Sequence, residues 1–477
     1  MREFKRTFIV TDWLRCLARK LFPEEVNDSY LYDNMDDALN DWLGIYYDEP
    51  FWLKDCHGKT LNLGASVASE FARLIMIEFD SEITGSERAE FLQKQYERLK
   101  EILRIKLEAG CACGGIMFKP YVKNGVILPD CITQDNFIPI HYDSEHITGA
   151  VFIDQQCKGK WYYTRLEKQV YDYNTKTHTI ESHFFVSRSY DSLGGETDPK
   201  KCEIWNGLEP YIAIEGVDRP LFAFWKVPFA NQIDKESPLG VSVYSRAVKL
   251  LKEADMQWDR YLWEYEGGAL AVDAGEEALR VRRSTDSEGK EIKTTEVPKS
   301  RERLFRSINI SADDNGKAFF NVFNPTLRDE SYARGLNEIK RQIEFNCSLA
   351  YGTLSNPQNV DKTAEEIKAS KQRSYTAVTD IQTSLEAVLK DYIYACDVMT
   401  TVCNLAPAGD YEVSFNWGDG VLEDKDKEQA IQLNEVNSGL RKKTDYIKWR
   451  YGVDNKQAEE MLPDSGVEPF FNEGGGA

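Results

Sequence analysis

The sequence is poor in the side chains from which enzymes usually build a catalytic or metal site. Only five histidines occur among its 477 residues, and no two of them stand four positions apart. The ten cysteines are scattered, no Cys-x-x-Cys pair exists, and Cys111-Ala-Cys113 has the wrong spacing for a zinc knuckle. No Walker A loop, nucleophile elbow, His-Glu-x-x-His motif or dinucleotide-binding glycine motif is present. We therefore expect no cofactor, no bound metal, and reduced, mostly buried thiols of a cytosolic protein.

Long apolar runs and an excess of positive charge are also missing. No stretch of about 18 apolar residues offers a membrane span, and Asp12 and Arg15 interrupt the segment where an export signal needs its apolar core. Lys and Arg number 59 against 79 Asp and Glu, which gives a net charge of −20. A basic-faced nucleic-acid binder is therefore unexpected. A protein past which DNA slides is still possible, because phosphate contacts are the source of non-specific affinity.

The first half of the chain mixes helical and strand patterns. A basic amphipathic helix is expected near residues 3–22, and apolar spacing near 3.6 predicts helices over residues 64–79 and 86–109. From residue 114 onward the pattern changes to strands. Asn124-Gly125, placed between two apolar runs, predicts a tight β-hairpin.

Two amphipathic helices then flank a charged, β-prone insertion at residues 267–328. The first helix is predicted over residues 237–266, with Ser237 as N-cap and Pro238 at the first helical position. Thirty residues at 1.5 Å each would make a rod of roughly 45 Å. The second helix is predicted over residues 329–350.

Asp255 interrupts the otherwise apolar seam of the first helix, between Leu251 and Trp258. A carboxylate is costly to bury unless it is paired. Two alternatives stay open: the seam rotates and Asp255 is solvated, or Asp255 meets a basic residue. That residue would be Lys340 or Arg341 of the second helix, or a group on another subunit.

The last third of the chain begins with a loop at residues 351–362, which contains Gly352 and Pro357. A helix of unusual length is predicted over residues 363–404, and a strand and further helix follow within residues 405–477. Taken alone, these elements fit an α-helical bundle that only binds partners. An alternative is a metal-dependent nuclease or transferase that uses acidic residues near positions 410–428, namely Asp419, Glu423, Asp424, Asp426 and Glu428.

The order of several motifs resembles the portal, or head–tail connector, proteins of tailed bacteriophages, in the branch found in long-tailed phages of Gram-positive hosts. The hairpin that leads to Asp135–Pro139 is similar to the family's wing hairpin, and Ser-Pro-Leu-Gly-Val-Ser at residues 237–242 is similar to the entry to its first stem helix. Thr363-Ala364-Glu365-Glu366 departs by one position from the family's Thr-Ala-Thr-Glu. The strand at residues 411–417 resembles one near the crown.

This resemblance implies an α+β portal fold that assembles into a ring of about twelve subunits at one capsid vertex. Its parts would be a mixed wing (1–236), a two-helix stem (237–266 and 329–350), a small β-containing clip (267–328), a tunnel loop (351–362), a long helix (363–404), and a crown with the C-terminal tail (405–477). It implies no enzymatic activity and no membrane. The implied partners are double-stranded DNA, bound transiently, the large subunit of the terminase motor, a head-completion adaptor, and the major capsid and scaffolding proteins. The ring would be assembled in the host cytoplasm and end in the virion.

Two site hypotheses follow from the resemblance. Nine basic and five acidic residues lie between Arg280 and Arg306, so the clip is either an ordinary charged loop or a docking surface for motor and adaptor, built from Arg280, Arg282, Arg283, Arg301 and Arg303. The loop at residues 351–362 is either a surface connector between two helices or the part that lines the DNA channel. In the second case the neutral amides of Asn356, Gln358 and Asn359 would contact phosphates without the counterion release that holds DNA in place. Lys362 is the fourth channel candidate in the same loop. Trp258 and Asp255, with Lys340 and Arg341, are the candidates for the subunit interface.

Overall fold

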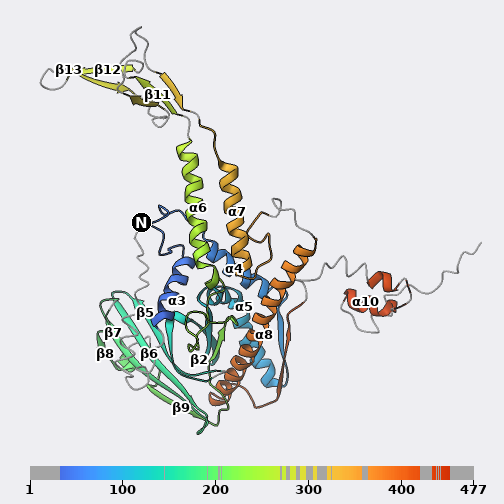
Figure 1. Cartoon of the computed structure of the whole chain (residues 1–477). Coiled ribbons are helices and arrows are strands. Elements are labelled where there is room, and N and C mark those ends of the chain that lie inside the picture. Colours follow the sequence, from blue (N-terminus) through green and yellow to red (C-terminus); the bar gives the residue numbers. More distant parts are fainter. Residues whose placement is uncertain are drawn as a thin grey trace, which may run out of the picture. The chain divides into compact units, whose positions relative to one another are not determined.

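The computed structural model divides the chain into two compact units (Figure 1). The larger unit holds residues 1–76 and 80–415, and the smaller one holds residues 77–79 and 416–477. The structure describes residues 33–143, 146–190, 192–201, 205, 207–268, 271–275, 280–285, 291–296, 305–308, 320–323, 325–356, 364–418, 432–436, 438, 440 and 442–451. The predicted helix near residues 3–22 lies outside this set.

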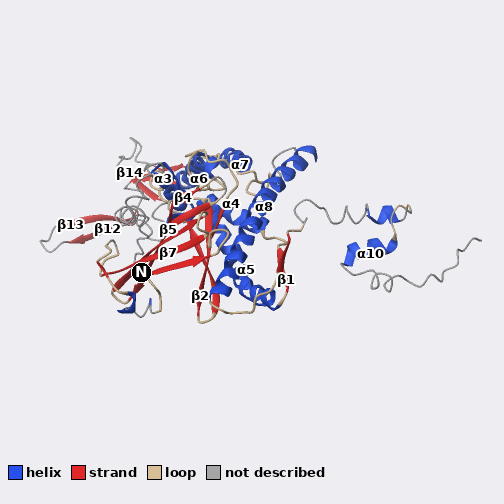
Figure 2. Cartoon of the chain, turned by 90° about the horizontal axis from the view of Figure 1, so that it is seen from below, coloured by secondary structure: helices blue, strands red, loops and turns tan. Residues whose placement is uncertain are grey.

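A three-stranded antiparallel sheet and its covering helices form the core of the larger unit. The strand order is β10-β2-β3, with β2 at Gly115–Lys123, β3 at Val126–Thr133 and β10 at Ala223–Lys226. Helices pack on this sheet or on one another: α3 (Asp33–Tyr46), α4 (Leu63–Ile75), α5 (Glu87–Cys113) and α8 (Ala364–Val402). Figure 2 shows α4, α5 and α8 on one side of β2 and the strands of a larger sheet on the other.

Helices α5 and α8 form where apolar residues recur every three or four positions, which places them on one face. The buried stripe of α5 consists of Leu92, Tyr96, Leu99, Leu103 and Leu107. The stripe of α8 consists of Val378, Ile381, Leu385, Leu389 and Tyr392. The structure confirms the helices that this periodicity predicted.

The hairpin predicted from Asn124-Gly125 is confirmed. Strands β2 and β3 pair in antiparallel register up to Lys123 opposite Val126, so that only Asn124 and Gly125 form the turn. Both residues have positive φ, 54° and 75°, as a type I′ turn requires.

A six-stranded antiparallel sheet lies beside this core. Its order is β4-β5-β6-β7-β8, and β9 also pairs with β7. The bounds are β4 Phe137–Tyr142, β5 Ile147–Lys158, β6 Trp161–Asp172, β7 Thr177–Ser187, β8 Gly195–Glu196 and β9 Tyr211–Glu215. Aromatic rings join the two sheets, since Phe137 meets Phe224 of β10 edge to face at 5.4 Å. Mixed helix and sheet content therefore agrees with the predicted fold class.

A buried ion pair also links β2 to β6. Lys119 and Glu167 are 4% and 5% exposed, and Lys119 Nζ lies 2.7 Å from Glu167 Oε1. Arg165 Nη1 lies 2.8 Å from the second carboxylate oxygen of Glu167. Burial raises the pKa of Glu167, but the charges of Lys119 and Arg165 outweigh burial and lower this pKa to about 2. The carboxylate is therefore ionised at neutral pH.

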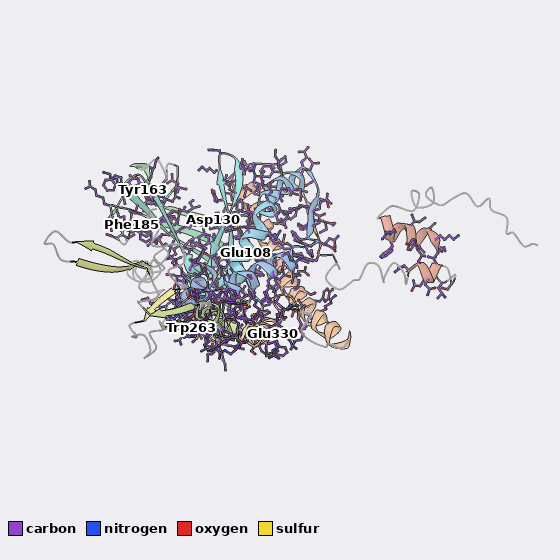
Figure 3. All side chains as sticks on the ribbon, turned by 90° about the horizontal axis from the view of Figure 1, so that it is seen from above. Glu108, Asp130, Tyr163, Phe185, Trp263 and Glu330 are labelled. Carbon is purple, nitrogen blue, oxygen red and sulfur yellow. The ribbon has the colours of Figure 1, made fainter. Side chains whose placement is uncertain are left out.

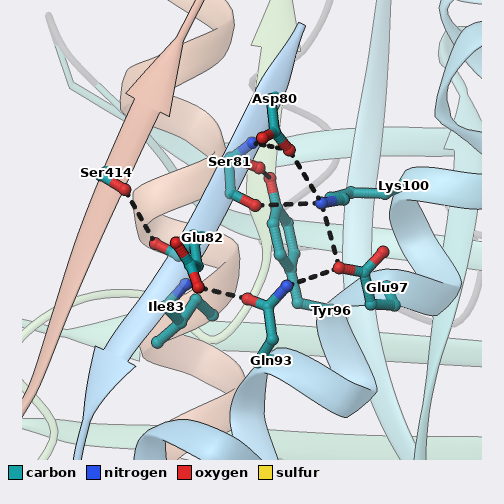
Figure 4. A network of polar contacts seen from close by, with 9 residues as sticks. All are labelled: Asp80, Ser81, Glu82, Ile83, Gln93, Tyr96, Glu97, Lys100 and Ser414. Atoms are coloured by element: carbon teal, nitrogen blue, oxygen red, sulfur yellow. Dashed lines mark hydrogen bonds and ion pairs between the residues drawn. The ribbon is translucent and has the colours of Figure 1, made fainter. Parts of the chain in front are cut away.

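Strand β1 (Asp80–Gly85) pairs with β16 (Tyr411–Asn416), far away in the sequence. Polar side chains of α5 attach β1 to the core (Figure 4). Ser81 Oγ donates to the hydroxyl of Tyr96 at 3.0 Å, and Lys100 Nζ donates to the carbonyl oxygen of Ser81 at 3.0 Å. The smaller unit contains helix α10 (Lys443–Tyr451), and the rings of Phe79 and Trp417 lie 4.5 Å apart within it.

The described cysteines are free thiols, as predicted. Burial raises the pKa of Cys113, Cys347 and Cys396 to about 12, so these three are protonated at neutral pH. Among the described residues, no helix combines the length and the apolar character needed to cross a membrane.

Candidate functional site

Two neighbouring helices carry the insertion that separates them in sequence. Helix α6 (Val248–Gly267) leads away from the core, and α7 (Asp329–Asn346) returns beside it (Figure 1). The described parts of the insertion are strands. Strand β11 (Ala271–Gly275) lies between β14 (Phe305–Ile308) and β15 (Phe320–Phe323), and β12 (Arg280–Thr285) pairs with β13 (Glu291–Glu296). The geometry is thus a two-helix stalk that ends in small sheets.

The predicted start of the first helix is wrong. Residues 237–244 are not helical, a 3-10 turn covers Ser245–Ala247, and α6 begins at Val248. Tertiary hydrogen bonds hold the preceding segment in another conformation. Gly240 N–H donates to Gln134 Oε1 at 2.8 Å, and Val243 N–H donates to the carbonyl oxygen of Cys111 at 3.0 Å. With 20 residues, α6 is about 30 Å long rather than 45 Å.

This segment also approaches the end of α5 closely, at two glycines. A Cβ on Gly240 would lie 2.0 Å from the carbonyl oxygen of Gly114, and a Cβ on Gly114 would lie 2.6 Å from that of Gly240. Gly114 also has a φ of +99°, which L side chains rarely adopt. The segment is therefore fixed against the end of α5.

Asp255 is buried at the base of the stalk, only 5% exposed. Its Oδ2 accepts a hydrogen bond from Trp52 Nε1 at 2.9 Å, and its Oδ1 accepts one from the Leu61 N–H at 2.8 Å. Burial raises the pKa of this carboxyl, and the two hydrogen bonds act in the opposite direction. Asp255 is therefore neither solvated nor paired with a basic residue in the described part of this chain, which were the two alternatives from the sequence. Its hydrogen-bond donors come from the loop between α3 and α4.

The other interface candidates lie elsewhere on the stalk. Trp258 is half-buried and stacks on Tyr261, with ring centroids 5.6 Å apart. Arg341 Nη1 lies 3.0 Å from Glu338 Oε2, one turn away on α7. Lys340 is half-buried and has no ion pair with any residue that the structure describes. Neither basic residue is therefore the partner of Asp255 in this chain.

An ion pair joins the two ends of the insertion. This pair was not predicted from the sequence. Glu264, near the end of α6, accepts hydrogen bonds from Arg328 Nη2 at 2.7 Å and from Arg328 Nε at 3.0 Å. These bonds lower the pKa of Glu264. The sequence does carry a signal for this ion pair: Glu264 and Arg328 have opposite charges and stand at the two ends of the insertion that joins α6 and α7.

The clip arginines are described in part. Arg280, Arg282 and Arg283 belong to β12, where they stand in register with Glu296, Thr294 and Lys293 of β13. Arg301 and Arg303 lie outside the described residues.

The loop after α7 is described up to Asn356, an exposed residue whose N–H donates to Asn337 Oδ1 at 2.7 Å. Gln358, Asn359 and Lys362 lie outside the described residues. Glu344, which sequence reasoning did not single out, is fully buried beneath this loop and accepts hydrogen bonds from its backbone.

No cluster of three or more potential metal ligands occurs in the part of the chain that the structure describes. The acidic residues Asp419, Glu423, Asp424, Asp426 and Glu428 lie outside that part. The alternative of a metal-dependent nuclease or transferase gains no support from the stalk, the loop or the family match below.

Comparison with known proteins identifies the family. No curated protein matches the chain. The family model described as phage portal protein, SPP1 Gp6-like, matches residues 75–465. This match spans the three-stranded core sheet, the six-stranded sheet, the stalk with its insertion, and the long helix α8. The chain therefore belongs to the SPP1 Gp6-like family of phage portal proteins.

Proposed function

We propose that the chain assembles into a ring of about twelve subunits, whose central channel passes double-stranded DNA during genome packaging and ejection. Residues 1–236 form the wing, α6 and α7 form the stem, and residues 267–328 form the clip. Residues 351–362 form the tunnel loop that lines the channel, and residues 405–477 form the crown and tail.

The observation that carries the ring is the aromatic surface of the stem. Trp263 (Figure 3) and Tyr265 on α6 are 64% and 41% exposed, and Phe345 on α7 is 52% exposed. Trp263 and Tyr265 lie near the far end of α6, and Phe345 lies at the core end of α7, so exposed aromatic side chains occur at both ends of the stalk. Exposed large apolar groups mark candidate interaction surfaces. In a ring, neighbouring stems cover these side chains, and Trp258, Lys340 and Arg341 come close to the same interface.

The clip provides the docking surface for the terminase large subunit and the adaptor. Its arginines give local positive charge to an acidic chain, and opposite charge steers association. The wing meets the major capsid and scaffolding proteins. The protein acts as a conduit without catalytic activity, is assembled in the host cytoplasm and is located at one capsid vertex of the virion.

Replacement of Trp263 and Tyr265 by serine tests the ring directly. Both side chains are exposed on the surface of the single chain, so the double variant should fold normally by circular dichroism. It should shift from rings to smaller species in mass photometry, because it loses the surface that neighbouring stems cover. Ile105→Ser is the matched control, since Ile105 is 72% exposed on α5, outside the stem. Rings of unchanged mass and stability in the double variant would count against this interface.

A further inference from the structure

The turn that follows α7 is built around one buried carboxylate. Glu344 is 0% exposed, and its Oε1 accepts hydrogen bonds from the N–H groups of Gly352 at 3.1 Å, Leu354 at 2.6 Å and Ser355 at 2.8 Å. Its Oε2 accepts a fourth hydrogen bond, from Ser355 Oγ at 2.8 Å. A buried N–H group left without an acceptor costs free energy, so these bonds matter to the turn. Four of them on one carboxylate hold the turn firmly.

The turn depends on this side chain because its backbone has few other acceptors. Residues 351–356, called here the loop root, contain neither helix nor strand. The Thr353 N–H donates to the carbonyl oxygen of Ala350 at 3.2 Å and the Asn356 N–H to Asn337 Oδ1 at 2.7 Å, whereas the N–H groups of Gly352, Leu354 and Ser355 all donate to Glu344. Gly352 has a φ of +91°, which brings the chain back over the end of α7. Ser355 is only 5% exposed, so its N–H and hydroxyl groups lie away from bulk water.

A second attachment joins the loop root to α7 and α8. The guanidinium groups of Arg341 on α7 and Arg373 on α8 each lie 5.3 Å from the centre of the Tyr351 ring. Arg373 also lies 4.6 Å from the centre of the Phe345 ring. Such cation–π contacts are attractive, most of all where water is excluded. The loop root is therefore tied to the stem helix through its backbone and to both helices through Tyr351.

We propose that Glu344 is the positioning residue of the tunnel loop. It fixes the loop root to the second stem helix, so that α7 and residues 351–356 move as one body and present the rest of the loop to DNA from a defined point. The role in DNA passage rests on the proposed function. The attachment itself rests only on the four hydrogen bonds.

Hydrogen exchange tests the attachment independently of DNA. Glu344→Ala removes the acceptor for three N–H groups, so exchange in peptides covering residues 351–356 should become at least tenfold faster. Glu344→Gln keeps one carbonyl oxygen at the same position and should show a smaller increase. Glu330→Gln is the matched control, because Glu330 is exposed near the other end of the same helix and should leave this exchange unchanged. Unchanged exchange in both Glu344 variants overturns the proposal, and if the alanine variant does not fold, the glutamine variant decides.

DNA packaging by reconstituted full-chain rings tests the positioning role. We expect Glu344→Ala to form normal rings in electron micrographs yet to package DNA several-fold more slowly, with partial recovery in Glu344→Gln. Faster exchange together with a wild-type packaging rate overturns the positioning role. Wild-type rings that do not package DNA would instead contradict the proposed function, and the exchange result would still decide whether Glu344 holds the loop root.

Discussion

Removal of the Asp255 carboxylate should destabilise the fold by detaching the loop between α3 and α4 from the stem. In Asp255→Ala, the Trp52 indole N–H and the Leu61 N–H both lose their acceptor. Trp52 is 1% exposed, so its indole nitrogen lies away from bulk water. A buried donor left without a partner costs about 1–3 kcal/mol. Leu61 is only half-buried and should contribute less.

A second effect reduces this loss. Burial raises the pKa of Asp255, which means that the ionised carboxylate itself is disfavoured in the folded protein. Alanine removes that cost together with the hydrogen bonds. We therefore expect Asp255→Ala to lower the free energy of unfolding by about 2 kcal/mol. Asp255→Asn keeps one acceptor oxygen and should lower it by about half as much.

Urea denaturation at pH 7, followed by circular dichroism, measures this difference. Protein concentration must be held constant, because oligomerisation changes apparent stability. Glu253→Gln provides the control, since Glu253 is exposed on the same helix and should alter the free energy of unfolding by less than about 0.5 kcal/mol. If Asp255→Ala is as stable as this control, the carboxylate does not anchor the stem.

Three further predictions concern strand β12, the loop after α7 and the acid stability of the sheet that holds Glu167. Reversal of Arg282 and Arg283 to glutamate should leave rings intact and weaken binding of the motor several-fold, with a larger loss at low salt. A pull-down with the terminase large subunit measures this binding, and binding equal to wild type would reject the docking surface. Lysines in place of Gln358 and Asn359 should slow DNA translocation, most strongly at low salt, and wild-type rates at all salt concentrations would show that this loop does not face DNA. Since the pKa of Glu167 falls from an ordinary 4.5 to about 2 on folding, its stabilising effect should be complete above pH 4.5 and be lost as the pH falls towards 2. Urea denaturation between pH 7 and 3 should give a flatter pH dependence for Glu167→Gln than for wild type, and identical slopes would contradict the assigned pKa.

Features that depend on short stretches of sequence were predictable. Asn124-Gly125 identifies the hairpin because a type I′ turn needs two consecutive residues that tolerate positive φ. The long helix α8 follows from apolar spacing alone, since it packs on a sheet along one face.

Features that depend on distant contacts were not predictable. The segment before α6 carries apolar residues at helical spacing, but hydrogen bonds to Gln134 and Cys111 and the contact between Gly114 and Gly240 hold it out of the helix. The donors to Asp255 come from residues about 200 positions away in the chain, which no local pattern indicates.

In the candidate site, too, local features were predictable and features that depend on distant contacts were not. The two stem helices and the loop after them could be placed from sequence, because helix periodicity and glycine or proline punctuation are local signals. The role of Glu344 could not be inferred, because a glutamate in a helix is ordinarily solvated and only the returning loop buries it.

Electron microscopy of the purified 477-residue chain in negative stain tests the central claim most directly. We expect rings with a central channel, formed from many copies of the 54.7 kDa chain. Particles of a single 54.7 kDa chain at every protein concentration, with no ring, would contradict the central claim.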